Sequence, residues 1–260
     1  MLGAIAGDII GSVFEFHPVK TVEFELFSAH GYFTDDTVLT VATAFSLLTD
    51  GDYRANYRLF GRLYPKAGYG ARFDRWLHGP GDAPYGSLGN GSAMRVAPIG
   101  FAFDDEDRVL AEAARSAAVT HDHPEGIKGA QAVALGILLA RQGVARPEIG
   151  RELGRRFGYD LSRTPDLIRP GYGFDETCPG SVAEAISCFL AAADWDHAVR
   201  LAVSLGGDAD TQACIAGALA EASFAGLPPG IAAAARGFLP EHLLEIVDEF
   251  LGKYPGPAPA

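Results

Sequence analysis

The sequence predicts an all-α protein, built as a single compact domain of orthogonally packed helices. Apolar residues recur at helical spacing in segment after segment, and no sustained alternation or hairpin dipeptide indicates strands. Two short acidic segments, residues 34–37 and 206–211, would close the domain end to end if they meet. We therefore expect about ten helices in a domain over residues 1–254, followed by a loose tail over residues 255–260.

Composition and charge narrow the class of protein. The 260 residues are 48% hydrophobic and 10% aromatic, which is typical of a globular protein with one sizeable core. The net charge of −12 argues against non-specific nucleic-acid binding, which needs a basic surface. No apolar run has the length of a membrane span, and the first residues lack the basic region of a signal peptide. We expect a cytoplasmic monomer that does not bind membranes.

The first helix is predicted at residues 3–16, where three glycines at four-residue intervals would let another backbone approach closely. Asp8 and Glu15 are seven residues apart and would share a face of this helix. A carboxylate is poorly accommodated in so apolar a run, which makes Glu15 a functional candidate.

The other helices are predicted from stripes of apolar residues at helical spacing. They are expected at residues 38–48, 53–64, 105–119, 126–141, 147–157, 182–190, 195–203, 212–224 and 243–250. Residues 17–33 are expected to form a loop. The Gly- and Pro-rich residues 65–93 predict a second, longer loop, and loops of that length are usually functional.

Two acidic segments each stand directly before an apolar helix. They are Thr34-Asp35-Asp36-Thr37 and Gly206-Gly207-Asp208-Ala209-Asp210-Thr211. Helix capping explains a single Asp or Thr at such a place, but capping uses one side chain per helix, and here four carboxylates crowd two helix starts. If the two starts converge, the like charges need a cation. Oxygen ligands favour Mg²⁺ or Mn²⁺ over zinc, so we expect a metal centre with room for two ions.

Two further segments have more than one reading. The glycine-rich residues 85–95 could cradle a diphosphate with backbone N–H groups, although a flexible turn explains the same pattern. The residues Thr120-His121-Asp122-His123-Pro124 could cap the next helix. The dipeptide His121-Asp122 also allows a helical phosphohydrolase of the HD type, which would need further His and Asp ligands.

Five motifs follow one another along nearly the whole chain. They are Gly7-Asp8-Ile9-Ile10-Gly11-Ser12 through Glu15, residues 34–37, Gly89-Asn90-Gly91-Ser92-Ala93-Met94-Arg95, residues 120–124 and residues 206–211. Each alone is unspecific, but in this order they resemble the ADP-ribosylglycohydrolase family, which includes the dinitrogenase-reductase-activating glycohydrolase and the ADP-ribosyl-acceptor hydrolases. The resemblance implies an all-helical fold with a binuclear Mg²⁺ or Mn²⁺ centre in a cleft. It also implies hydrolysis of the bond between ADP-ribose and an acceptor.

By motif position, the resemblance implies a role for particular residues. The implied metal ligands are Thr34, Asp35, Asp36, Asp208, Asp210 and Thr211. The implied catalytic residues are Glu15 and Asp36, of which Glu15 would stabilise an oxocarbenium-like transition state or activate water. The implied substrate contacts are Gly86, Ser87, Asn90, Gly91, Ser92, His121 and Phe174, with Tyr172 as the alternative to Phe174 for stacking on adenine.

The acceptor stays open at this point. In arginine-directed members of the family the position three before the loop asparagine is often acidic, whereas this chain has Ser87. An arginine linkage, a serine-type linkage, a nucleobase adduct and a small ADP-ribosyl metabolite all remain candidates. A non-catalytic regulatory module that binds ADP-ribose is a further alternative, so ADP-ribose or an ADP-ribosylated substrate is the expected partner in either case.

Overall fold

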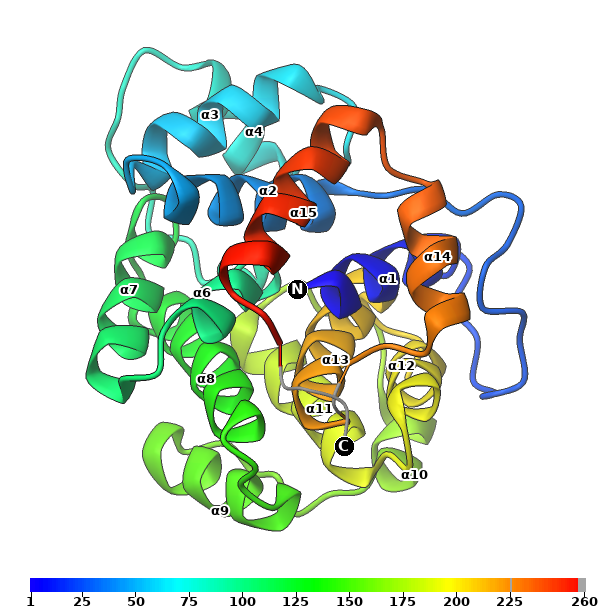
Figure 1. Ribbon diagram of the computed structural model, residues 1–260. Helices are drawn as coiled ribbons and strands as arrows, with labels where there is room; N and C mark the ends of the chain where they lie inside the picture. Colours follow the sequence, from blue (N-terminus) through cyan, green and yellow to red (C-terminus); the bar gives the residue numbers. More distant parts are fainter. Residues whose placement is uncertain (225, 257–260) are drawn as a thin grey trace.

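Fifteen α-helices and one short 3-10 helix make up the computed structural model, which describes residues 1–224 and 226–256 (Figure 1). No strand occurs in these residues, and the prediction of an all-α fold is confirmed. The helices are α1 (Leu2–Gly11), α2 (Asp35–Leu48), α3 (Tyr53–Leu63), α4 (Ala71–His78), α5 (Gly91–Met94), α6 (Ala97–Ala102), α7 (Glu106–Ala118), α8 (Pro124–Arg141), α9 (Arg146–Phe157), α10 (Pro165–Ile168), η1 (Arg169–Gly171), α11 (Cys178–Ala191), α12 (Trp195–Ser204), α13 (Ala209–Ser223), α14 (Pro229–Gly237) and α15 (Glu241–Lys253).

Helix α13 forms the centre of the core, because every residue from Ala209 to Ala222 is buried. Helices α1, α8, α11 and α12 pack around it (Figure 1). Helix α1 is also buried at every residue, which suits a helix that is apolar on all sides. The first helix of the chain and a helix near its end thus form one core, and this packing brings the two acidic segments to the same place.

Glycines of α1 allow its backbone to lie against α13. A Cβ atom added to Gly7 would lie 2.8 Å from Cys214 N, and one added to Gly11 would lie 2.6 Å from Asp210 N. Both distances are too short for real contacts, so a larger residue would push the helices apart. The predicted close approach of a second backbone is therefore confirmed.

The first helix is shorter than predicted, because α1 ends at Gly11 instead of continuing for another turn. The Ser12 hydroxyl donates to the Ile9 carbonyl at 2.9 Å, and the chain turns at this point. Glu15 consequently lies in the loop of residues 12–33, called the Glu15 loop below, and not on a helix face.

The expected number of about ten helices is too low, because five further short helices form in segments to which the sequence analysis assigns no helix. They are α4, α5, α6, α10 and α14. The prediction of one long loop over residues 65–93 is wrong where α4 and the start of α5 interrupt it. Helix α4 forms because Phe73, Trp76 and Leu77 share one face and are buried. The Arg62 guanidinium of α3 donates to the Leu77 carbonyl at 2.9 Å, so tertiary contacts stabilise this short helix.

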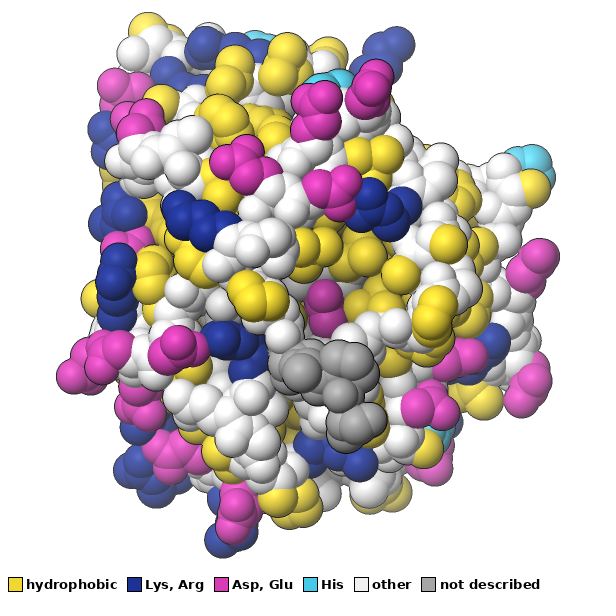
Figure 2. Space-filling model, viewed as in Figure 1, with side chains coloured by type: hydrophobic (Ala, Val, Ile, Leu, Met, Phe, Trp, Pro, Cys, Tyr) yellow, Lys and Arg dark blue, Asp and Glu magenta, His cyan; other side chains and the backbone are white. Residues whose placement is uncertain are grey.

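The end of the chain, the hydropathy of the helices and the surface charges complete the description of the fold. Helix α15 ends at Lys253, and residues 257–260 of the predicted tail lie outside the described residues, so the domain boundary stays a prediction. None of the described helices combines the length and apolar character that crossing a membrane requires. On the face in Figure 2, acidic and basic side chains are interspersed around apolar ones.

Candidate metal centre and ligand cleft

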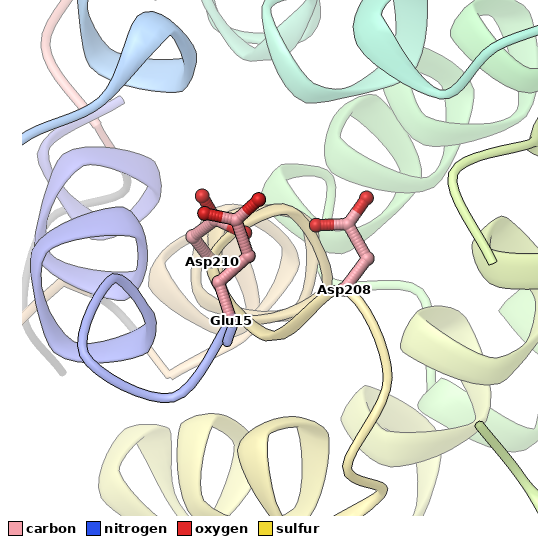
Figure 3. Close-up of side chains that lie close together, drawn as sticks. All are labelled: Glu15, Asp208 and Asp210. Carbon is pink, nitrogen blue, oxygen red and sulfur yellow. The ribbon is translucent and has the colours of Figure 1, made fainter. Parts of the chain in front are cut away.

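Three carboxylates from opposite ends of the chain lie together at the start of α13 (Figure 3). Glu15, Asp208 and Asp210 each offer a carboxylate oxygen within 4.8 Å of the others. Asp208 is the N-cap residue of α13 and Asp210 lies in its first turn, while Glu15 reaches this place from the Glu15 loop. The arrangement concentrates negative charge at one helix start.

The start of α2 adds the other acidic segment to this cluster. Thr211 Oγ1 lies 3.3 Å from Asp36 Oδ2, which joins the two segments directly. Thr34 Oγ1 is 3.4 Å from the same oxygen and accepts a hydrogen bond from Asp36 N at 3.2 Å. Residues 34–37 and 206–211 therefore meet, as the sequence predicts.

Asp8 supports the start of α2 from within α1. Its carboxylate accepts hydrogen bonds from Thr34 N at 2.9 Å, Thr34 Oγ1 at 2.8 Å, Thr37 N at 3.1 Å and the Thr37 hydroxyl. Asp8 belongs to one of the sequence motifs but has no predicted role there, and the shared face expected with Glu15 does not form because α1 ends at Gly11. The signal that points to Asp8 is a carboxylate inside a glycine-spaced, otherwise apolar helix, which needs donors from elsewhere.

Burial governs the electrostatics of the cluster. Burial, followed by the charges of Asp210 and Asp8, raises the pKa of Glu15 to about 8. Burial and then Asp210 also hold the pKa of Asp36 and of Asp208 well above the usual range. Without a cation, burial and the neighbouring charges therefore favour the protonated forms of these carboxyl groups.

The donor set fits a hard divalent cation. Asp36 is only 2% exposed, and its buried Oδ1 has no hydrogen-bond partner among the described residues. A buried carboxylate oxygen without a donor is costly unless a cation takes that place. The surrounding groups are carboxylate and hydroxyl oxygens, which suit Mg²⁺ or Mn²⁺.

A cleft of about 280 Å³ opens over this cluster. Most of the predicted site residues line it: Glu15, Asp35, Asp36, Ser87, Asn90, Gly91, His121, Phe174, Asp208, Asp210 and Thr211. Thr34, Gly86 and Ser92 do not line it. Thr34 lies behind Asp36, Gly86 N donates to Asp122 Oδ1 at 2.7 Å, and the Ser92 hydroxyl donates to the Gly126 carbonyl at 2.7 Å.

The glycine-rich loop before α5 is held in place by the segment before α11. Asn90 N donates to the Glu176 carbonyl at 2.8 Å, and Cys178 N donates to the Leu88 carbonyl at 2.9 Å. The Asn90 side chain donates to Asp208 Oδ2 at 2.7 Å. Asn90 therefore ties the loop to the acidic cluster, which a freely flexible turn would not do.

His121 lies buried beside this loop as a neutral imidazole. Burial, together with the charges of Arg95 and Arg72, lowers its pKa well below the usual value. Its Nδ1 is 2.7 Å from Thr120 Oγ1, and a Cβ atom added to Gly91 would lie 3.2 Å from its Nε2. The free edge of the ring thus faces the glycine-rich loop.

The two candidates for aromatic stacking differ in their surroundings. Phe174 is 56% exposed and lines the cleft. The Tyr172 hydroxyl donates to the Gly180 carbonyl at 2.6 Å and accepts from Gln212 Nε2 at 2.9 Å, and Tyr172 is absent from the described lining. Of the two residues, Phe174 is therefore the one whose ring a ligand in the cleft could contact.

Several lining residues carry no role in the sequence analysis, because side chains from unrelated segments meet here only in three dimensions. They include Arg72, Phe73, Tyr85, Arg95 and Glu176. The guanidinium group of the exposed Arg72 lies 5.0 Å from the centre of the Tyr85 ring, so a cation stands at the rim of the cleft.

Known proteins that resemble this chain identify its family. A family model described as ADP-ribosylglycohydrolase matches residues 1–259. ADP-ribosylhydrolase ARH3 of Mus musculus is 28% identical over 304 residues, covering 86% of this chain and 82% of the mouse protein. The Homo sapiens protein of the same name is 29% identical over 306 residues, covering 86% and 84%. A solved structure titled ADP-ribosylglycohydrolase-related protein complex superposes with a TM-score of 0.75 at 26% identity, covering 97% of this chain and 96% of that one. The chain therefore belongs to the ADP-ribosylglycohydrolase family.

Proposed function

We propose that the protein is a metal-dependent hydrolase that cleaves the glycosidic bond between ADP-ribose and an acceptor and releases ADP-ribose. The family implies a substrate of the ADP-ribose type. The observation that carries the proposal is the convergence of acidic side chains from both ends of the chain at the floor of one cleft, beside a glycine-rich loop.

Two acidic helix starts would hold the metal ions. The proposed ligands are Thr34, Asp35, Asp36, Asp208, Asp210 and Thr211, and Mg²⁺, or alternatively Mn²⁺, is the proposed ion, with two ions at the site. When bound, divalent ions supply Lewis-acid coordination of ribose hydroxyl groups and charge stabilisation. The four hydrogen bonds to Asp8 keep the start of α2 in place for this task.

Glu15 is the proposed catalytic carboxylate. Breaking the glycosidic bond builds positive charge on the anomeric carbon, and a carboxylate beside it stabilises that charge. Glu15 can also accept the proton of the attacking water while the bond to the acceptor breaks. Glu15 is only half-buried and accepts no recorded hydrogen bond among the described residues, so it can approach a ligand more readily than the buried aspartates. Asp36, whose Oδ1 has no hydrogen-bond donor among the described residues, is the second proposed catalytic carboxylate.

The remainder of the cleft would bind ADP-ribose. Backbone N–H groups near Ser87 and Gly91, supported by Asn90, suit the diphosphate and the distal ribose. His121, as a neutral imidazole, offers a ring nitrogen without introducing a charge. Phe174 offers an exposed ring for the adenine.

The test is the release of free ADP-ribose from arginine-linked and serine-linked substrates, with Mg²⁺, with Mn²⁺ and with EDTA. Metal-dependent release from either substrate supports the proposal and also settles the linkage that Ser87 leaves open. Asp208→Asn and Glu15→Gln should remove most of the activity, whereas Glu152→Gln, a change on exposed α9, should not. Release that persists in EDTA and in Asp208→Asn would refute the metal mechanism.

The alternatives make different predictions. A regulatory module would bind ADP-ribose without releasing it from any of these substrates, even with excess metal. An HD-type phosphohydrolase would release phosphate from nucleotides and depend on His121 and Asp122. In the structure, His121 Nδ1 is bonded to Thr120, Asp122 accepts from Gly86 N, and the metal-competent cluster among the described residues contains neither.

A further inference from the structure

Lys20 of the Glu15 loop is hydrogen-bonded to the backbone of segments far away in the sequence. Its Nζ donates to the carbonyl oxygen of Arg169 at 3.0 Å, to that of Tyr172 at 2.6 Å, and to that of Leu205. An ammonium group has three donors, so these three bonds use all of them.

The three carbonyl groups belong to segments that carry candidate site residues. Arg169 is the C-cap residue of α10, and Tyr172 opens the stretch that leads to Phe174. Leu205 is the C-cap residue of α12 and precedes Asp208 by three positions. Carbonyl groups at helix ends lack intrahelical donors and carry partial negative charge, which makes an ammonium group a favourable partner.

Two glycines leave the room that this arrangement needs. Gly206 has a φ of +66°, and a Cβ atom there would lie 2.9 Å from Lys20 Cε. A Cβ atom on Gly207 would collide with the ring of Tyr172. The glycines that precede Asp208 therefore admit the side chains of Lys20 and Tyr172 as well as forming the turn.

The part of the Glu15 loop that carries Glu15 has its polar attachment to distant segments through Lys20, while Phe14 and Val19 pack against the core. Among the described residues, the three Lys20 bonds are the hydrogen bonds that link residues 13–21 to segments distant in the sequence. The next anchor is Arg200, whose Nη1 donates to the Val22 carbonyl at 2.9 Å. Without Lys20, the stretch around Glu15 would lose its polar attachment to the body of the molecule.

We propose that Lys20 is a positioning residue, which holds the Glu15 loop against the stretch after α10 and the turn before α13. The inference rests on the proposed function, because its consequence for catalysis is the placement of Glu15 beside Asp208 and Asp210. Lys20 does not line the described cleft, so it acts through Glu15 and not by touching the substrate.

This role predicts different effects on turnover and on ligand binding. Tyr172 keeps its bonds to Gly180 and Gln212 when Lys20 is removed, so the stretch leading to Phe174 stays attached to α11 and α13. Lys20→Met should therefore lower kcat by about 10-fold or more, since small misplacements of a catalytic group are costly. The dissociation constant of ADP-ribose should change much less than kcat.

The first experiment compares Lys20→Met with the intact protein by amide hydrogen exchange and by steady-state kinetics. We expect faster exchange at the hydrogen-bonded amides beside this attachment, those of Phe14, Leu205 and Gly206. The melting temperature should stay unchanged within about 2 °C, because the Lys20 side chain is exposed. Lys253→Met on α15 is the matched control and should change neither exchange nor kcat.

The second experiment restores the ammonium group chemically. Lys20→Cys is alkylated with 2-bromoethylamine, which forms a thioether of nearly the length of lysine with loss of bromide, or with iodoacetamide, which leaves a neutral group. The three native cysteines are buried, so the folded protein treated in the same way serves as the control. The ammonium product should regain slow exchange and kcat, and the neutral product should not.

The outcomes separate this inference from the proposed function. Unchanged exchange in Lys20→Met, or equal recovery with both alkylating reagents, would overturn the positioning role. If exchange responds as expected but no substrate releases ADP-ribose in any form of the protein, the attachment by Lys20 stands and the proposed function fails.

Discussion

The starts of α2 and α13 have similar sequences but are supported in different ways. At α2, Thr34 caps the helix and Asp8 accepts four hydrogen bonds from Thr34 and Thr37. At α13, no side chain caps the helix, and Asp208 receives its hydrogen bond from Asn90 of a distant loop. Asp8, which does not line the cleft, thus accepts hydrogen bonds from the protein, while Asp36, which does line it, has one oxygen without a partner among the described residues. The protein therefore supplies the hydrogen bonds of Asp8, whereas Asp36 keeps one oxygen for the cation that we propose.

Replacing Asp36, a carboxylate that lines the cleft, should have the largest effect on activity. Asp36→Asn removes a proposed ligand, so kcat for ADP-ribose release should fall at least about 100-fold, and the rise in melting temperature on adding Mg²⁺ should disappear. In EDTA at pH 8 the same variant should melt at a higher temperature than the intact protein, because a neutral amide replaces a buried carboxyl group that repels its neighbours when it ionises. Full stabilisation by Mg²⁺ in the variant would show that Asp36 is not a ligand.

Replacing Asp8 should lower the stability of the fold without depending on metal, in contrast to the replacement of Asp36. In Asp8→Asn the amide NH₂ faces groups that are themselves donors, so the free energy of unfolding should fall by about 3 kcal/mol, whether metal is present or not. Urea unfolding with Mg²⁺ and with EDTA measures this. A loss confined to the Mg²⁺ samples would instead assign Asp8 to the metal site and end the distinction drawn above.

Disturbing the packing of α1 on α13 should have the next largest effect, on the free energy of unfolding. Gly7→Ala places a Cβ atom against Cys214 N and should lower the free energy of unfolding by about 1–3 kcal/mol. Gly230→Ala on α14 is the matched control, because no atom lies within 4 Å of the added Cβ, and its effect should be near zero. Equal stabilities for the two variants would mean that the close approach does not constrain the helices.

The pH dependence of the metal-free protein should be the smallest effect. The pKa of Asp8 is raised to about 7 and that of Glu15 to about 8, chiefly by burial, from ordinary values of about 4. The folded protein therefore binds more protons than the unfolded chain between these values, and its stability is lost as pH rises from about 4 to about 8. Melting curves in EDTA should shift down by about 2–5 °C over this range, and Mg²⁺ should reverse the shift most strongly at high pH. A melting temperature in EDTA that rises with pH would contradict the raised pKa values.

The long amphipathic or fully apolar helices were predictable, because their period is written in local sequence. The short helix α4 was not, since its formation depends on the burial of Phe73, Trp76 and Leu77 beside α3. The end of α1 at Gly11 was also missed, because apolar character continues past the residue where the chain turns.

The all-α class, the family motifs and the acidic residues at two helix starts could be predicted from the sequence alone. Those features depend on residue type and spacing, which a chain carries regardless of how it folds. Which carboxylates share a site depends on tertiary packing, because Asp36 and Thr211 are 175 residues apart in the sequence. Tertiary packing also brings Asp8 to the threonines and Lys20 to three distant carbonyl groups. Such contacts arise from the packing of α1 on α13, and no local pattern encodes the distances that this packing produces.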